Sequence, residues 1–307
     1  MGQIAFLFSG QGAQTPGMGQ SWIKHGGRAK AVFDMAETLR PGTCAECFEG
    51  DKETLSQTQN TQPCLFCVDL AAAEALREAG ISPAAVAGFS LGEIPAAAFA
   101  GMLSPEKAFA LVVERGLAMQ ACAQANPGSM AAVLGLSDET VEAACEAHGS
   151  FPVNYNCPGQ LVIAGETEAL TATIAELKAV KGRVLPLGVS GAFHTPYMKG
   201  AKEALQDFLS KNPLRIPRLP LYANQTGKPY AEPLEKQLCE QVANPVRWKE
   251  TLTNMWQDGI RVFIEVGIGQ TLCGLVKKTL PEATVLSVTD GESLQAALAE
   301  LKGADIC

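Results

Sequence analysis

Apolar and polar positions along the chain define two kinds of segment. Short continuous apolar runs such as 3–8 are typical of strands buried in a parallel sheet, and longer stretches with helical periodicity are typical of helices. We expect strands over 3–8, 85–89, 130–136, 152–156, 161–165, 183–187, 219–223, 262–266 and 284–288. We expect helices near 29–39, 64–79, 105–124, 138–148, 167–180, 197–210, 248–258, 270–279 and 291–301.

The order of these segments changes in the middle of the chain. Between 126 and 191 it is β-α-β-β-α-β, the order of a ferredoxin-like unit, and on either side strands and helices alternate. We therefore expect an α/β fold in which a large α/β-hydrolase-like domain, 1–125 plus 192–307, is interrupted by a ferredoxin-like small lobe at 126–191. Ligands bind such sheets outside the carboxyl ends of the strands, and a cleft between two lobes is a natural site.

Composition and charge exclude several classes of protein. Apolar residues make up 47% of the chain and charged residues 18%, so it can bury a large core and is not disordered. The net charge of −8 argues against nucleic-acid binding, which needs a basic surface. No apolar run reaches the length of about 18 residues that indicates a membrane span. Residues 1–8 carry neither a basic leader nor a cleavage site, so we expect a cytoplasmic protein. We also expect a monomer.

The ten cysteines leave two interpretations open. Cys44, Cys47, Cys64 and Cys67 follow the pattern C-x2-C-x16-C-x2-C, which is zinc-ribbon spacing. The second pair, however, begins an apolar helical run, where buried free cysteine is common. We expect reduced thiols and no bound metal in a cytosolic protein. A zinc-dependent interaction protein is the alternative.

Residues 88–92 (Gly-Phe-Ser-Leu-Gly) form a G-x-S-x-G motif after a predicted strand and before a helix. This is the context of a nucleophile elbow, a tight turn that exposes the serine hydroxyl above the sheet. The helix N-terminus directs free N–H groups to the same point, so the N–H of Leu91 can stabilise an oxyanion. Ser90 is therefore a candidate nucleophile. The alternative is an ordinary serine in a surface turn.

A serine needs a base to act as a nucleophile, and the chain has three histidines. His148 ends a predicted helix, and His25 lies in a glycine-containing loop, so we interpret both as surface residues. His194 lies where the chain returns from the small lobe to the large domain, which makes it the best-placed base. The alternative is a packed histidine that caps the next helix.

Two further features bear on the substrate. The loop 9–14 (Ser-Gly-Gln-Gly-Ala-Gln) follows the first strand and lacks the phosphate-loop patterns G-x-x-x-x-G-K-[ST] and G-x-G-x-x-G. We therefore expect this loop to supply a second oxyanion donor, the backbone N–H of Gln11, and not to bind phosphate. Arg115 lies in an otherwise apolar helix. It is either a surface residue paired with Glu114 or its neighbours, or a fork that holds a carboxylate bidentately.

Eight separated motifs occur in the order found in one enzyme family. They lie at 8–14, 58–63, 88–93, 114–116, 154–160, 191–194, 241–248 and 265–267. Over nearly its whole length the chain resembles the malonyl-CoA:acyl carrier protein transacylases of type II fatty acid synthesis. The resemblance implies transfer of a malonyl group from malonyl-CoA to the phosphopantetheine thiol of acyl carrier protein. It also implies a malonyl-serine intermediate and no cofactor.

The resemblance implies roles for individual residues. Ser90 is expected to be acylated, with His194 as its base in a Ser–His dyad that has no acidic third member. The backbone carbonyl of Gln241 is expected to orient the histidine. Gln11 and Leu91 are expected to form the oxyanion hole.

The resemblance also assigns the acyl pocket. Arg115 is expected to clamp the malonyl carboxylate, Gln62 to line the pocket, and Phe193 to fill the space that a 2-methyl group needs. Phe89 is a departure, because the family usually has histidine at this position. That histidine is not the base, so we still expect activity.

Two other kinds of enzyme are alternatives. An acyltransferase serving a polyketide or polyunsaturated lipid synthase would share all these residues, whereas a serine hydrolase would give Arg115 no role. Acyl carrier proteins are acidic, so we predict that the basic residues of 199–228 flank the docking site, together with Lys178, Lys181 and Arg183.

Overall fold

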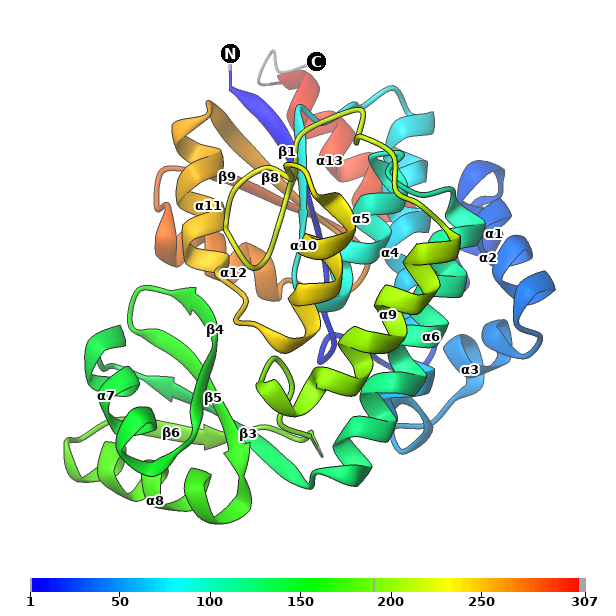
Figure 1. Ribbon diagram of the computed structural model, residues 1–307. Helices are drawn as coiled ribbons and strands as arrows, with labels where there is room; N and C mark the ends of the chain where they lie inside the picture. Colours follow the sequence, from blue (N-terminus) through cyan, green and yellow to red (C-terminus); the bar gives the residue numbers. More distant parts are fainter. Residues whose placement is uncertain (1, 190, 304–307) are drawn as a thin grey trace.

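The strands of the computed structural model, which describes residues 2–189 and 191–303, form two separate sheets (Figure 1). The five-stranded sheet has the order β7-β2-β1-β8-β9 and is parallel, and the four-stranded sheet has the order β4-β5-β3-β6 and is antiparallel. The strands are β1 (Gln3–Phe8), β2 (Ala85–Gly88), β3 (Gly128–Leu134), β4 (Phe151–Cys157), β5 (Gln160–Glu166), β6 (Arg183–Pro186), β7 (Leu221–Tyr222), β8 (Ile260–Val266) and β9 (Thr284–Val288).

Helices cover both faces of the five-stranded sheet and one face of the four-stranded sheet. They are α1 (Gln20–His25), α2 (Gly27–Leu39), α3 (Thr43–Glu49), α4 (Thr58–Glu78), α5 (Glu93–Phe99), α6 (Pro105–Ala125), α7 (Asp138–His148), α8 (Thr167–Ala179), α9 (Lys199–Lys211), α10 (Leu234–Glu240), α11 (Trp248–Gln257), α12 (Thr271–Thr279) and α13 (Gly291–Gly303). None of the helices in the described ranges combines the length and the apolar character needed to cross a membrane.

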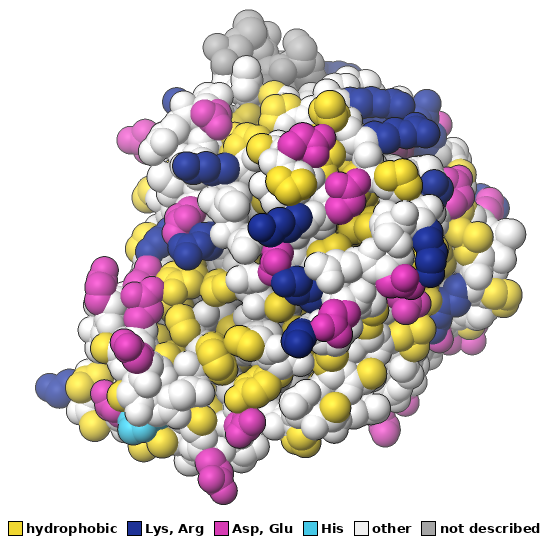
Figure 2. All heavy atoms as spheres, in the orientation of Figure 1, with side chains coloured by type: hydrophobic (Ala, Val, Ile, Leu, Met, Phe, Trp, Pro, Cys, Tyr) yellow, Lys and Arg dark blue, Asp and Glu magenta, His cyan; other side chains and the backbone are white. Residues whose placement is uncertain are grey.

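Charges of both signs share the surface. On the face drawn in Figure 2, the Lys and Arg side chains alternate with Asp and Glu side chains over α9 and α10 and do not form one block. All three lysines of α9 take part in ion pairs: Lys199 with Glu203, Lys202 with Glu240, and Lys211 with Asp207. The predicted basic segment is therefore partly neutralised by its own neighbours.

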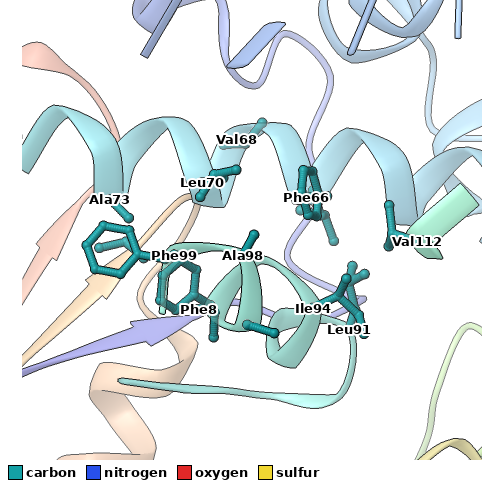
Figure 3. Packing of buried hydrophobic residues seen from close by; sticks show 14 of the residues in the cluster. Phe8, Phe66, Val68, Leu70, Ala73, Leu91, Ile94, Ala98, Phe99 and Val112 are labelled. Atoms are coloured by element: carbon teal, nitrogen blue, oxygen red, sulfur yellow. The ribbon is translucent and has the colours of Figure 1, made fainter. Parts of the chain in front are cut away.

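The central strand β1 shows why this sheet needs two helical layers. Phe6 and Phe8 point to the face covered by α4 and α5, whereas Ala5 and Leu7 point to the face covered by α11 and α12. Successive side chains of a strand alternate between faces, so a strand covered on both sides is a continuous apolar run. Figure 3 shows the first layer, in which the short helix α5 lies between α4 and β1.

The four-stranded sheet has one helical face and one face turned to the rest of the molecule. Ala131 and Val133 of β3 pack under α7 and α8. Their neighbours Met130 and Ala132 point the other way and line cavities beside the five-stranded sheet. This second face brings the inserted sheet to the carboxyl ends of β1 and β2.

Most predicted elements exist, with shifted ends. The helix expected from 64 begins at Thr58, so Pro63 lies inside it. A proline inside a helix costs about 3 kcal/mol, and the complete burial of the apolar residues Leu65 and Phe66 after it offsets that cost. The strand expected over 219–223 has two residues, because Pro220 has no N–H to pair. The short helices α1, α3 and α10 were not predicted.

Candidate active site

β2 ends in a tight turn that carries Ser90. Ser90 begins a 3₁₀ turn that continues directly into α5, and its φ is 52°. The turn needs glycine on both sides. A Cβ on Gly88 would overlap the backbone of Gly92, and a Cβ on Gly92 would overlap the carbonyl group of Phe8. The sequence folds into this turn because both flanking positions lack a side chain.

The side chains of Ser90 and His194 meet directly. Ser90 Oγ lies 2.7 Å from His194 Nε2, and His194 Nδ1 lies 3.0 Å from the carbonyl oxygen of Gln241 and 3.1 Å from that of Asn244. Because carbonyl oxygens only accept, we assign the ring proton to Nδ1. The lone pair of Nε2 then faces the serine hydroxyl, which is the arrangement of a nucleophile and its general base.

His194 is neutral near pH 7. Burial first, and the positive charge of Arg115 second, lower the pKa of its imidazole to about 4, against the two carbonyl hydrogen bonds. The φ of His194 is 62°, so both partners of the hydrogen bond have a left-handed backbone. Strain of this kind gathers where the surrounding structure fixes a functional geometry.

Arg115 reaches into the site from α6 and is completely buried. Its Nη1 donates to Gln62 Oε1 at 2.8 Å, and its Nη2 donates to Gln241 Oε1 at 2.9 Å and to Ser90 Oγ at 3.3 Å. Its Nε has no hydrogen-bond partner among the described residues. The guanidinium is thus held by two amides and still has a free donor.

Arg115 has no carboxylate partner among the residues that the structure describes. None of the ion pairs within 2–189 and 191–303 includes Arg115. The surface ion pair with Glu114 is therefore wrong, because Glu114 is exposed on the other side of α6. Burial lowers the pKa of Arg115 to about 10, opposed by the charge of Glu93, so the group stays protonated near pH 7.

A cavity of about 80 Å³ opens beside the Ser90–His194 contact, between elements of the two sheets. It is lined by Gln11, Phe89, Ser90, Met119, Met130, Asn154, Leu187, Val189, Phe193 and His194. A second cavity of about 230 Å³ shares four lining residues with the first. They are Gln11, Phe89, Asn154 and Leu187.

The remaining predicted residues surround the same contact. Gln11 follows β1, and Phe193 precedes the histidine. Leu91 directs its side chain into the core (Figure 3). Its backbone N–H lies in the first turn of the elbow helix, where an N–H has no helical acceptor. Gln62 lines neither cavity but holds Arg115, and its Nε2 lies 3.4 Å from the sulfur of Met119.

Phe89 replaces the family's usual histidine with an apolar ring. The ring packs edge-on against Trp248 of α11, with centroids 5.3 Å apart. It lines both cavities, so it forms part of the wall between them.

The other histidines and the cysteine pattern lie away from this site. His148 Nε2, at the end of α7, lies 2.7 Å from a carboxylate oxygen of Glu176 on α8, and His25 packs against Trp22. The first two cysteines of the zinc-ribbon pattern lie on α3 and the last two on α4. In the part of the chain that the structure describes, no group of three or more Cys, His, Asp or Glu could hold a metal ion.

Two buried polar residues beside Ser90 were not singled out from the sequence. The side chain of Asn224 accepts a hydrogen bond from the Ser90 N–H. The buried carboxylate of Glu93 accepts from the backbone N–H of Asn224 and from the hydroxyl of Tyr230. Burial raises the pKa of Glu93 to about 7. A signal existed for Asn224, because it directly follows a predicted parallel strand, at the sheet edge where ligands bind.

Comparison with known proteins agrees with an enzyme that transfers acyl groups. Residues 5–298 match the acyl transferase domain. This match spans nearly the whole chain, so the protein belongs to the acyl transferase domain family.

Within this family the chain belongs with the malonyl CoA-acyl carrier protein transacylases, which confirms the resemblance. It is 38% identical to the transacylase of Bacillus subtilis (strain 168), over 98% of both chains. The crystal structure of the enzyme from Clostridium perfringens matches with a TM-score of 0.95 and 33% identity, over 99% of this chain and 98% of that one. A malonyl-transacylase in complex with a type II PKS acyl-carrier protein, PlMCAT:AntF, matches with a TM-score of 0.93 and 34% identity, over 97% of this chain and 99% of that one.

Proposed function

We propose that the enzyme transfers malonyl from malonyl-CoA to the phosphopantetheine thiol of acyl carrier protein, through an ester on Ser90, and so supplies fatty acid synthesis. Arg115 carries this proposal. It is a buried cation without a carboxylate partner among the described residues, 3.3 Å from the serine hydroxyl. A malonyl group offers the missing carboxylate, whereas an acetyl group offers no charge. Charge-assisted bonds of this kind contribute about 1.5–3 kcal/mol each.

In the first half-reaction, His194 Nε2 removes the proton from Ser90 Oγ while Oγ attacks the thioester carbonyl carbon. The N–H groups of Gln11 and Leu91 stabilise the oxyanion that forms. The carbon–sulfur bond then breaks, and the departing CoA sulfur takes the proton from His194. The malonyl group remains on Ser90 as an ester.

In the second half-reaction, the carrier thiol gives its proton to His194 and its sulfur attacks the ester. The carbon–oxygen bond breaks, and Ser90 Oγ takes the proton back. The larger cavity suits the amide-containing arm of the carrier, because the amide residues Asn154, Asn156 and Gln160 line it. The apolar walls of the smaller cavity help to exclude water, which would otherwise hydrolyse the ester.

Phe193 is proposed to select malonyl over methylmalonyl. It is 6% exposed and lines the smaller cavity beside the histidine. One extra methyl group in a pocket costs about 1–3 kcal/mol, so this selection is substantial and incomplete.

We also propose the division into domains: 1–125 with 192–307 as an α/β-hydrolase-like domain, and 126–191 as a ferredoxin-like lobe. The five-stranded sheet uses strands from the first two ranges, and the four-stranded sheet uses strands from the third. The order β4-β5-β3-β6, with α7 and α8 on one face, supports the ferredoxin-like description. We propose a monomer, as expected from the sequence.

A polyketide carrier is the second candidate acceptor. The match to a transacylase bound to a type II PKS acyl-carrier protein favours it specifically. The chemistry at Ser90 would be the same, so transfer rates to the two kinds of carrier distinguish the candidates.

Intact-mass measurement after incubation with malonyl-CoA tests the proposal. We expect a gain of one malonyl group in the wild type, none in Ser90→Ala, and much less with acetyl-CoA. Arg115→Gln should lower malonyl loading by about 10- to 100-fold and spare acetyl loading, because one charge-assisted interaction is lost. CoA release without a stable adduct would instead indicate a serine hydrolase.

A further inference from the structure

The backbone at Ser90 is strained and has to be held in place. Of the non-glycine residues in the described ranges, only Ser90, Lys181 and His194 have a positive φ. A left-handed conformation costs an L-residue about 1–2 kcal/mol. It persists only where neighbouring groups fix it. The proposed nucleophile and base are two of these three residues.

One side chain, Asn224, bridges the two peptide groups that flank residue 89. Its Oδ1 accepts from the Ser90 N–H at 2.6 Å, and its Nδ2 donates to the Gly88 carbonyl at 2.6 Å. An N–H can only donate and a carbonyl can only accept, so the amide has one possible orientation. The bridge spans the turn at its tightest point.

Asn224 is itself fixed by the neighbouring strand. β7 pairs in parallel with β2, and Asn224 is the second residue beyond β7, as Ser90 is the second beyond β2. The Asn224 N–H faces both carboxylate oxygens of Glu93 at 3.4 Å, and its carbonyl accepts from the Arg247 N–H at 2.8 Å. The residue is 1% exposed.

We infer that Asn224 is a positioning residue that acts through the backbone of the elbow to aim Ser90 Oγ at His194. The inference rests on the proposed role of Ser90 as the nucleophile. Gln241 holds the other side of Ser90, because the Gln241 Nε2 donates to the Ser90 carbonyl. Loss of Asn224 leaves a buried N–H and a buried carbonyl without partners, and the turn relaxes to satisfy them.

Asn224→Leu removes both hydrogen bonds. We expect the rate of malonyl-enzyme formation to fall about 100-fold, since a small displacement of a reacting group has an effect of this size. The KM for malonyl-CoA should change little, because Gln62 and Gln241 hold Arg115 and Asn224 does not. A retained rate of more than half would overturn the inference.

Asn224→Asp keeps the acceptor and loses the donor only when the new carboxyl is ionised. Glu93 from α5, with Tyr230 on it, Arg115 from α6 and His194 all lie around this position. Burial and the Glu93 carboxylate favour the neutral form of the new group. The variant should therefore approach the wild-type rate near about pH 5, where a carboxyl O–H replaces Nδ2–H, and lose activity as the pH rises.

Asn254→Asp is the matched control. Its Nδ2 also donates to a backbone carbonyl, that of Gly227 at 2.8 Å, in the turn that follows Asn224. It should show neither the rate loss nor the pH dependence. A pH-independent loss in Asn224→Asp, or an equal loss in the control, would show a merely structural role.

Labelling of Ser90 by a fluorophosphonate separates this inference from the proposed function, because the reagent needs no malonyl group. If wild type labels but takes up no malonyl, the proposed function fails, and the labelling rates of the variants still test Asn224. If the Asn224→Leu protein does not fold, the pH profile of Asn224→Asp decides.

Discussion

At the scale of single residues, the buried charge of Arg115 acts on two groups at once. It lowers the pKa of His194, and it lies 3.3 Å from the hydroxyl of Ser90, the proposed nucleophile. A substrate carboxylate that binds Arg115 compensates this charge, so the depression of the pKa becomes smaller. The histidine is then a stronger base with malonyl-CoA in place than in the free enzyme.

The pH profile of acylation should report this residue. Because burial and Arg115 lower the pKa of His194 to about 4, kcat/KM for malonyl-enzyme formation should fall only below about pH 5. In Arg115→Gln the fall in kcat/KM at low pH should begin at a higher pH, because one cause of the lowered His194 pKa is removed. Rapid-quench measurement of malonyl-enzyme across pH checks both; an acid limb near the ordinary histidine pKa in wild type would contradict the assignment.

The lowered pKa of His194 also makes the stability of the fold depend on pH. The unfolded chain takes up a proton at His194 near the ordinary histidine pKa of 6.5, whereas the folded chain does so only near a pKa of about 4. Between these values the unfolded state binds more protons, so this residue makes the free energy of unfolding fall as the pH falls.

At the scale of elements, the strand–turn–helix unit β2–α5 depends on the absence of side chains at its flanks. We expect Gly88→Ala to abolish acylation and to lower the free energy of unfolding by about 1–3 kcal/mol, because the new Cβ overlaps the backbone of Gly92. Gly274→Ala on α12 is the control. Apart from its chain neighbours and the backbone of its own helix, no described atom lies within 4 Å of its added Cβ, and alanine favours a helix interior by about 0.5–1 kcal/mol. Denaturant titration and intact mass measure both; normal acylation in Gly88→Ala would contradict the close-packed elbow.

Elements with a strong local pattern could be predicted from the sequence. The strand 284–288 has the expected bounds, and the elbow at Ser90 follows from two glycines between a strand and a helix. The start of α4 could not be predicted, because packing against distant segments determines it, whereas the shortness of β7 follows from Pro220, which the sequence shows. The position of Asn224 after a predicted strand was visible, but its contacts were not, because its partners lie 134 and 136 residues away.

The proposed reacting residues were easier to predict than the side chains that hold them in place. Ser90, His194 and Arg115 each belong to a short motif, and the structure brings them together. The amide side chains of Gln62 and Gln241 act by holding the arginine, and no local pattern in a sequence shows which buried amide holds which cation.

At the scale of the whole molecule, the basic residues of 199–228 lie at two different distances from the site. α9 begins just after His194, so Lys199 and Lys202 lie at its near end, and Lys211 lies about 18 Å further along the helix axis. Arg215 and Arg218 bond to Met102 and Ala100 and precede β7, at the end of the sheet where the strands start. Only the near group can flank a carrier that reaches Ser90 from the carboxyl ends of the strands.

Charge reversal tests this arrangement. Lys199→Glu with Lys202→Glu should slow malonyl transfer to acyl carrier protein several-fold and leave transfer to a small thiol unchanged. The matched pair Lys211→Glu with Arg215→Glu, at the far end, should have little effect on either rate. The reverse result would place the docking surface at the far end of α9.

The chain enters and leaves the small sheet at one place. Pro127, where the chain enters it, and Gly191, where the chain leaves it, pair with each other in an antiparallel bridge. The intervening segment supplies Met130, Leu187 and Val189 to the acyl cavity but neither the nucleophile, the base nor the arginine. Because its two ends already meet, the chain enters and leaves this segment at a single junction, while Asn154 pairs with Val246 and Asp138 with Lys249 across the contact between the sheets. The side chains that shape this wall of the cavity and the three groups proposed to react therefore lie on separate lengths of chain.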